Sequence, residues 1–324
     1  MTMPPKPTHL RVHQFVGLRP GPSLLVLGAV HGNETCGTRA IQRVLDELQS
    51  GELAITRGRL SLLPVTNPMA YHRGAREGER NLNRNLRRCA DPQDFEDRVA
   101  DALCPLLEAH EVLLDLHSFH TAGQPFVMLG PRNNHGALEP FSLAEPEERL
   151  AAHLGPRRVL EGWMEAYEQG VRRRRHERPA SSPELLDAAY GTGTVEYLRT
   201  RGGYGVTLEC GQHDDPHAPA VAYQAIRQTL ALLEMAPLPL APPRKDFQIL
   251  HLMDVIDRDH ADDEFARAWA SFDPVEQGQL IGRRHAGQEV RAPSDGFVVF
   301  PNPEALPGNE WFYFAVASDR VLRT

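Results

Sequence analysis

Short apolar blocks alternate with helical patterns over the first two thirds of the chain. Blocks typical of buried strands occupy residues 24–27, 59–65, 112–116, 126–129 and 203–211. Helices are predicted between them, over residues 34–48, 92–110, 147–167 and 217–235. This alternation predicts an α/β fold, with a mixed, mostly parallel sheet and helices on both of its faces.

The pattern changes after a proline-rich stretch at residues 236–245, which is typical of a stiff connector. Beyond this stretch the apolar runs are short and separated by turn residues, as in β-strands joined by turns. We therefore predict two domains, a larger one over residues 1–238 and a smaller β domain over residues 245–324.

Composition narrows the class of protein. The formal net charge is −8, which argues against general nucleic-acid binding. Neither a signal segment nor an apolar run of membrane-spanning length is visible in the sequence. The four cysteines form no C-x-x-C pair, which predicts reduced, buried thiols. We expect a cytoplasmic protein that acts on neither a membrane nor a nucleic acid.

The first apolar block leads directly into a candidate metal site. His31 and Glu34 lie three residues apart where a strand passes into a helix, and ligands of α/β proteins bind outside such strand ends. Imidazole and carboxylate groups are both good zinc ligands, and Gly32 permits a turn between them. The pair is equally compatible with a helix N-terminus that carries a first-turn Glu and an unrelated His.

Two further strand ends carry polar side chains. Asp115 and His117 close one strand, and Glu209 closes another. In a mostly parallel sheet these side chains meet His31 and Glu34 at one edge, where two His and one carboxylate would leave a catalytic zinc one position open for water. Glu209 is then the candidate base, and Asp115 a partner that orients His117. The alternative is a hydrogen-bonded core histidine and a carboxylate that caps a helix.

A long, arginine-rich polar stretch at residues 66–88 follows the second strand. Irregular loops of this length inside a compact domain are usually functional or disordered, and the position after a strand end favours function. Arg76 is the candidate for stabilising a developing oxyanion. Asn83 and Arg84 are candidates for an anionic end of the substrate, because arginine holds carboxylates bidentately. Alternatively, these arginines form a solvated face. A second basic run, residues 171–178, is expected to be a solvated helix end or loop.

Six short motifs follow one another along the chain. They are H-G-N-E at 31–34, N-P at 67–68, N-R at 83–84, D-L-H at 115–117, T-L-E-C-G at 207–211 and F-V-V-F-P-N-P at 297–303. Together they resemble the succinylglutamate desuccinylase/aspartoacylase family of zinc carboxypeptidase-like α/β enzymes, including its small C-terminal β domain. The resemblance spans nearly the whole chain and implies that this β domain caps the active-site cleft.

The resemblance implies roles for the residues at the strand ends. His31, Glu34 and His117 would bind one zinc ion per chain, and Glu209 would be the general base.

It also implies how the substrate is held. Arg76 would polarise the scissile carbonyl, and Asn83 with Arg84 would bind the α-carboxylate of the amino acid. Arg199, ten residues before Glu209, would bind a side-chain carboxylate.

The sequence departs from the family pattern at a few positions. Asn81 stands where the family usually has Asp before L-N-R, and Asn85 and Leu86 follow N-R where the family often has an aromatic residue. The substrate-binding Tyr of aspartoacylases is missing just after the F-x-N segment, and the nearest Tyr downstream is Tyr313. This last difference argues against N-acetylaspartate as the substrate.

We therefore predict a zinc-dependent amidohydrolase that removes the acyl group from an N-acyl amino acid. The amino acid is expected to be acidic, as in N-succinylglutamate, so that the partner is a small molecule carrying carboxylates; a homo-oligomer is compatible with the sequence. One rival is a zinc carboxypeptidase, which an open groove in place of a capped cleft would favour. The other is a non-catalytic carboxylate-binding homologue, which the intact ligand set and Glu209 argue against.

Overall fold

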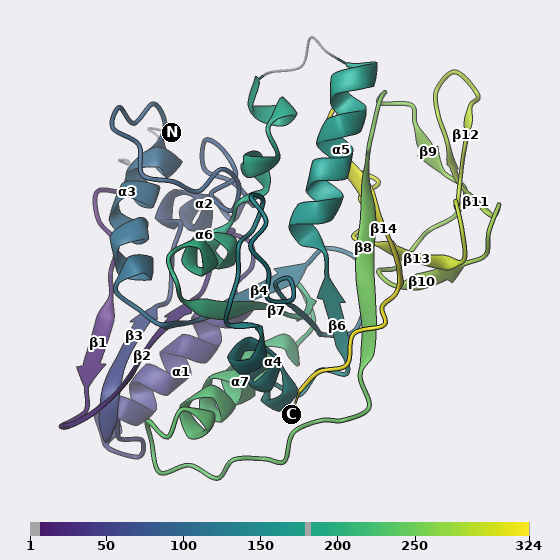
Figure 1. The fold of residues 1–324 in the computed structure, drawn as a ribbon. Coiled ribbons are helices and arrows are strands. Elements are labelled where there is room, and N and C mark those ends of the chain that lie inside the picture. The colour runs from purple at the N-terminus through teal and green to yellow at the C-terminus, as the bar shows by residue number, and fades with distance from the viewer. Residues whose placement is uncertain (1–6, 179–182, 324) are drawn as a thin grey trace.

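The computed structural model describes residues 7–178 and 183–323, and residues 1–6, where no signal segment was expected, lie outside this range. Among the described residues, eleven strands form one large mixed sheet, and β9 (Glu264–Phe265), β11 (Leu280–Arg283) and β12 (Glu289–Arg291) form a smaller antiparallel one (Figure 1). The large sheet has the order β1 (His13–Val16), β3 (Arg57–Leu63), β2 (Arg19–Leu27), β4 (Val112–Phe119), β7 (Tyr204–Gln212), β5 (Phe126–Met128), β6 (Arg158–Glu161), β8 (Gln248–Asp257), β14 (Glu310–Ala317), β13 (Gly296–Val299) and β10 (Asp273–Val275).

The centre of the sheet is parallel. Strand β2 pairs in parallel with β3 and β4, and β4 pairs in parallel with β7. The register sets Leu27 of β2 opposite Asp115 of β4, and His117 of β4 opposite Glu209 of β7. Because parallel strands end at the same edge, the polar residues that close these strands are brought together.

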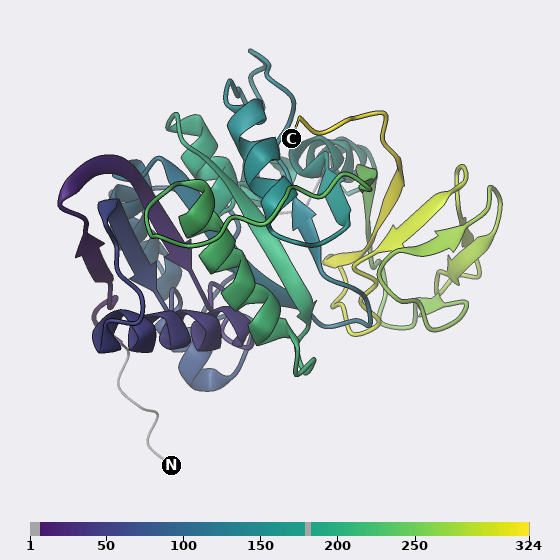
Figure 2. The same cartoon turned by 90° about the horizontal axis from the view of Figure 1, so that it is seen from below.

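Helices cover both faces of this sheet, as Figures 1 and 2 show. Alternate residues of a strand point to opposite faces. Leu24 and Val26 of β2 pack in one core with α1 (Cys36–Ser50), α4 (Ala144–His153) and α7 (Ala218–Leu232). Leu25 and Leu27 pack in another core with α3 (Phe95–Glu108) and α6 (Thr194–Thr200). The predicted α/β class, with a mixed sheet and helices on both faces, is therefore confirmed.

The helix predicted over residues 147–167 is instead two helices with a strand between them. The first is α4, which ends at His153 before Gly155 and Pro156; Gly155 has a φ of 104°. Strand β6 follows and is buried between β5 and β8, and α5 (Trp163–Glu177) begins after Gly162. The prediction was wrong here because β6 has only four residues, too few to show a strand pattern of its own.

The second basic run lies in the C-terminal half of α5 and, contrary to expectation, is only partly solvated. Arg174 is 3% exposed and holds both carboxylate oxygens of Asp257 in β8, at 2.7 and 2.8 Å. Arg173 pairs with Asp254 of the same strand. These contacts attach α5 to the part of the large sheet that follows the proline-rich connector.

Replacing Arg174 by Ala is expected to lower the free energy of unfolding by about 2 kcal/mol, because buried Asp257 loses its bidentate partner and keeps only its contact with Arg178 at 2.9 Å. Urea denaturation measures the change. Arg172→Ala is the matched control, because Arg172 neighbours Arg174 in α5 but its side chain is 65% exposed. Equal stabilities of the two variants would contradict the assignment.

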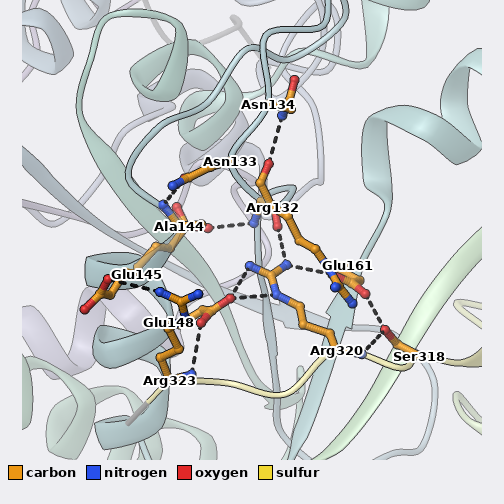
Figure 3. Close-up of polar contacts among 12 residues, drawn as sticks. Arg132, Asn133, Asn134, Ala144, Glu145, Glu148, Glu161, Ser318, Arg320 and Arg323 are labelled. Atoms are coloured by element: carbon orange, nitrogen blue, oxygen red, sulfur yellow. Dashed lines mark hydrogen bonds and ion pairs between the residues drawn. The ribbon is translucent and has the colours of Figure 1, made fainter.

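Residues near the C-terminus attach the end of the chain to α4 and β6. Arg320 is 4% exposed and donates to Glu148 of α4 at 2.9 Å, to Glu161 of β6 at 2.6 Å and to the carbonyl of Gly130 at 2.7 Å (Figure 3). Ser318 donates to the other oxygen of Glu161 at 2.5 Å. We call this group of contacts the Arg320 clamp.

Glu161 in the Arg320 clamp gives the fold a pH dependence. Burial alone would raise its pKa, but His251, Ser318 and Arg320 stabilise the carboxylate and lower the pKa from 4.5 to about 2. The resulting stability is fully present above pH 4.5 and is lost as the pH falls through about 2. Glu161→Gln is expected to be less stable than the wild type at pH 7, with a difference that shrinks below pH 4.5.

Denaturant unfolding at a series of pH values tests this expectation. Glu145→Gln, at a site 69% exposed in the same helix as Glu148, should behave like the wild type throughout. A stability difference for Glu161→Gln that does not change with pH would contradict it.

Among the described residues, no helix combines the length and the apolar character needed to cross a membrane.

Candidate metal centre

Three side chains converge on one point, two from the turn after β2 and one from the neighbouring strand β4. His31 Nδ1 lies 2.8 Å from Glu34 Oε1, and His117 Nδ1 lies 2.9 Å from Glu34 Oε2. All three residues are at most 3% exposed. Their donor atoms lie within 4.8 Å of one another, close enough to hold a single metal ion.

The turn after β2 places His31 and Glu34. Ala29 adopts a left-handed φ of 47°, which turns the chain at the end of the strand. Gly32 has no positive φ; it is required because a Cβ there would lie 1.9 Å from the backbone of Ala70 in α2 (Pro68–Arg73). The glycine predicted to allow a turn therefore allows a close approach of two backbones.

A second layer of contacts orients both histidines. Asn81 Oδ1 lies 3.0 Å from His31 Nε2, and Asp115 Oδ2 lies 3.0 Å from His117 Nε2. Asp115 also accepts a hydrogen bond from Thr194. Histidines that bind a metal through one ring nitrogen usually donate the other to such an acceptor. Both rings are thus arranged with Nδ1 toward the shared point.

The donor set fits a zinc ion. His31 Nδ1 is buried and has no hydrogen-bond partner among the described residues, although Glu34 is near. Burial, assisted by the charge of Arg76, lowers the pKa of His31 to about 4, so the ring is neutral and able to ligate. Burial opposes ionisation of Glu34, but the two histidines outweigh it and hold the pKa of this carboxyl well below its usual value. Asp115 and Glu34 outweigh burial at His117 and hold its pKa above the usual value, so this ring gives up a proton when it binds a metal. Two imidazoles and one carboxylate are a usual zinc set.

Glu209 lies beside this group, one strand away. It is 7% exposed, and its Oε2 atom has no hydrogen-bond partner among the described residues. Burial, followed by the charge of Glu34, raises the pKa of Glu209 to about 8. A carboxyl with such a pKa can exchange a proton near neutral pH.

These residues line one cavity of about 270 Å³. Arg76 also lines it and donates from Nη1 to Glu34 Oε1 at 2.8 Å, with its side chain 45% exposed. The segment after the proline-rich connector supplies another part of the wall, which consists of Phe300, Asn302, Glu310 and Tyr313.

Asn83 and Arg84 reach the same cavity, where both are already engaged. Asn83 Oδ1 accepts a hydrogen bond from the backbone of Thr194 at 3.0 Å. Arg84 donates from Nη2 to both oxygens of Glu310 in β14, each at 3.0 Å. Nothing in the local sequence pattern indicated Glu310, because its partner lies in a distant segment of the chain.

Arg199 is not brought to this cavity. It is 5% exposed and donates to Glu147 at 2.9 Å, to Glu139 at 2.8 Å and to the carbonyl of Gly205 at 3.0 Å. These contacts attach α6 to α4 and β7 in the interior. Arg199 therefore does not line the cavity that the metal-donor residues share.

Comparison with known families identifies the chain. A model of the succinylglutamate desuccinylase/aspartoacylase catalytic domain matches residues 20–234, which is more than half of the sequence. The chain belongs to this family. The match includes all of His31, Glu34, His117 and Glu209. The predicted family membership is thereby confirmed.

Solved structures show that the desuccinylase/aspartoacylase fold extends over nearly the whole chain. A succinylglutamate desuccinylase/aspartoacylase from Rhodobacter sphaeroides is 16% identical, with a TM-score of 0.71, over 96% of this chain and 90% of that chain. A succinylglutamate desuccinylase from Silicibacter sp. TM1040 is 18% identical, with a TM-score of 0.68, over 95% and 89%. A third, from Vibrio parahaemolyticus, is 19% identical, with a TM-score of 0.65, over 94% and 86%. No curated protein matches the sequence.

Within the family pattern, Asn81 was a departure from the usual Asp. Its side-chain oxygen is in contact with His31 and also accepts a hydrogen bond from the backbone of Asn83 at 2.9 Å. An amide oxygen can make both contacts, so the departure preserves the orientation of His31 and removes one negative charge beside the metal donors.

Proposed function

We propose that this protein is a zinc-dependent hydrolase that removes the acyl group from an N-acyl amino acid. The observation that carries the proposal is the convergence of His31, Glu34 and His117 with Glu209 in one buried cavity. Family membership supports the reaction class, since desuccinylases and aspartoacylases are acylases. The four cysteines are free thiols, which is compatible with action in the cytoplasm.

Zinc held by His31, Glu34 and His117 would supply a Lewis acid that polarises the amide carbonyl and activates water. Glu209 takes one proton from the attacking water on a carboxylate oxygen and returns that proton to the leaving amine. Arg76 stabilises the negative charge that develops on the carbonyl oxygen, because its half-exposed guanidinium has further N–H groups besides the one that donates to Glu34. The products are a carboxylate and a free amino group.

The cavity argues for a small substrate rather than a peptide. We propose that the segment over residues 245–324 caps the site, because four residues after position 299 form part of the wall. A cavity of about 270 Å³ holds an acylated amino acid, whereas a carboxypeptidase needs a groove that continues beyond the scissile bond.

We do not retain the expected preference for an acidic amino acid, since Arg84 and Arg199 are both paired with carboxylates of the protein.

A hydrolysis panel on zinc-loaded protein tests the proposal. N-acetyl, N-succinyl and N-formyl derivatives of acidic, neutral and basic amino acids are incubated with the enzyme, and the released amine is quantified. We expect turnover of at least one member and no cleavage of a dipeptide with a free N-terminus. A zinc-loaded protein that turns over no member would support the non-catalytic homologue instead.

A further inference from the structure

The feature that sets this cavity apart is the pairing of Arg84 with Glu310. Nη2 of Arg84 donates to both carboxylate oxygens at 3.0 Å, and Nε donates to Oε1 at 3.3 Å. Nη1 donates to the carbonyl of Asn83 at 2.9 Å. The edge of the guanidinium that would form two parallel bonds to a substrate carboxylate is thus already occupied.

The surroundings of Arg84 hold this pair in place. Its Cζ atom lies 4.7 Å from the ring centroid of Trp163 and 5.9 Å from that of Tyr167. The side chain of Arg84 is 8% exposed, and that of Glu310 is 28% exposed. Releasing Glu310 from Arg84 would leave a partly buried carboxylate without its partner, which is costly. A substrate carboxylate therefore competes poorly for this arginine.

Glu310 remains accessible from the cavity and is ionised. Burial alone would raise its pKa, but Arg84 and then Tyr313 stabilise the carboxylate and hold the pKa below its usual value. A carboxylate oxygen has room for more than one hydrogen-bond donor, so Glu310 can accept from a substrate while Arg84 stays bound.

The other charges of the cavity point the same way. Apart from the metal donors, the charged side chains that line it among the described residues are Arg76, Arg84, Glu196, Glu209 and Glu310. Arg199, the second arginine expected for a dicarboxylic substrate, lies in the interior. Glu310 is neutralised by Arg84, and Glu196 lies 3.4 Å from Arg199, so beside Glu310 the cavity offers no unpaired arginine to a second carboxylate of the substrate.

From this geometry we infer that Glu310 selects substrates whose amino-acid part carries a cationic side chain, namely N-acyl derivatives of a diamino acid. The inference rests on the proposed deacylase function and deepens it. The side-chain ammonium donates to Glu310, while the single α-carboxylate is left for the side-chain amide of Asn83 and the remaining N–H of Arg84. The substrate is then neutral overall, like the Arg84–Glu310 pair that it contacts.

The first test uses the unmodified protein loaded with zinc. Nα-acetyl-ornithine, Nα-acetyl-norleucine and Nα-acetyl-glutamate differ in side-chain charge but share the scissile amide. One charge-assisted hydrogen bond predicts kcat/KM about ten-fold higher for the ornithine derivative than for the norleucine derivative. Higher kcat/KM for the glutamate derivative than for the ornithine derivative would overturn the inference and leave the deacylase function standing.

The second test alters Glu310 alone. Glu310→Gln keeps the size and one acceptor oxygen but removes the charge, and it should reduce the preference for the ornithine over the glutamate derivative at least about ten-fold. Glu276→Gln, at an exposed position of the C-terminal segment, is the matched control and should keep the wild-type preference. Circular dichroism establishes that each variant is folded, and an unchanged preference in folded Glu310→Gln would overturn the inference.

Binding of the free amino acids supplies a readout that does not depend on turnover. Isothermal titration of the wild type should show tighter binding of ornithine than of glutamate, and Glu310→Gln should lose this difference. If no acylated compound is hydrolysed but ornithine binds as expected, the deacylase function fails and the role of Glu310 stands. Equal binding of ornithine and glutamate by the wild type would overturn that role.

Discussion

Glu209→Gln is expected to lower kcat for amide hydrolysis about 10²- to 10⁴-fold, the range that a general acid–base contributes. The amide of glutamine has the same shape as the carboxyl group, but it can neither take a proton from water nor return it to the leaving amine. Because Glu209 is not among the three metal donors, the variant should bind zinc as the wild type does. Zinc content by atomic emission and kcat on the best substrate of the panel are the two measurements.

Glu304→Gln is the control for this variant, since Glu304 is exposed on a loop of the C-terminal segment. It should retain wild-type kcat and zinc content. If Glu209→Gln kept full activity with zinc bound, another group would be the base. If it lost zinc as well, the separation between metal donors and base would be wrong.

His117→Ala is expected to weaken zinc binding by more than about 100-fold, beyond the loss usual for an outer-sphere partner, and to abolish hydrolysis. His117 contacts Glu34 through Nδ1 and Asp115 through Nε2. Its removal takes away one of three donors and leaves the buried carboxylate of Glu34 short of a partner. Competition with a chromophoric chelator measures the affinity of the variant for zinc.

His135→Ala is the control for removal of a histidine elsewhere in the protein. His135 is exposed and lies in neither β2 nor β4. It should bind zinc with wild-type affinity. Wild-type affinity in His117→Ala would remove His117 from the donor set, whatever the activity of that variant.

The centre of the fold could be predicted from the sequence, because the signals that define it lie within short segments of the chain. Strands β2, β4 and β7 are apolar runs that end in polar side chains, and parallel pairing brings such ends together without further information. The helix α2 was hidden inside the arginine-rich stretch, because six residues capped by Asn67 show little periodicity. Strand β6 was missed for a similar reason.

The substrate-facing part of the cavity could not be predicted in the same way. Arg84 and Glu310 are far apart in the chain, and neither flanking sequence indicates that one neutralises the other. Arg199 shows the converse: its spacing from Glu209 matches the family pattern, but Glu147 and Glu139 take up its guanidinium. Long-range ion pairs decide which arginines a substrate can reach. The order of residues along the chain does not show which residues form these pairs.

The position of β14 within the sheet also has a consequence for how the protein is made. His31, Glu34, His117 and Glu209 have all left the ribosome before Glu310, Tyr313 and Arg320 are synthesised. The parallel centre of the sheet contains only earlier strands, so it can pair while the chain is still growing. The residues that could hold a metal are therefore assembled first, and the C-terminal part of the cavity wall is added last.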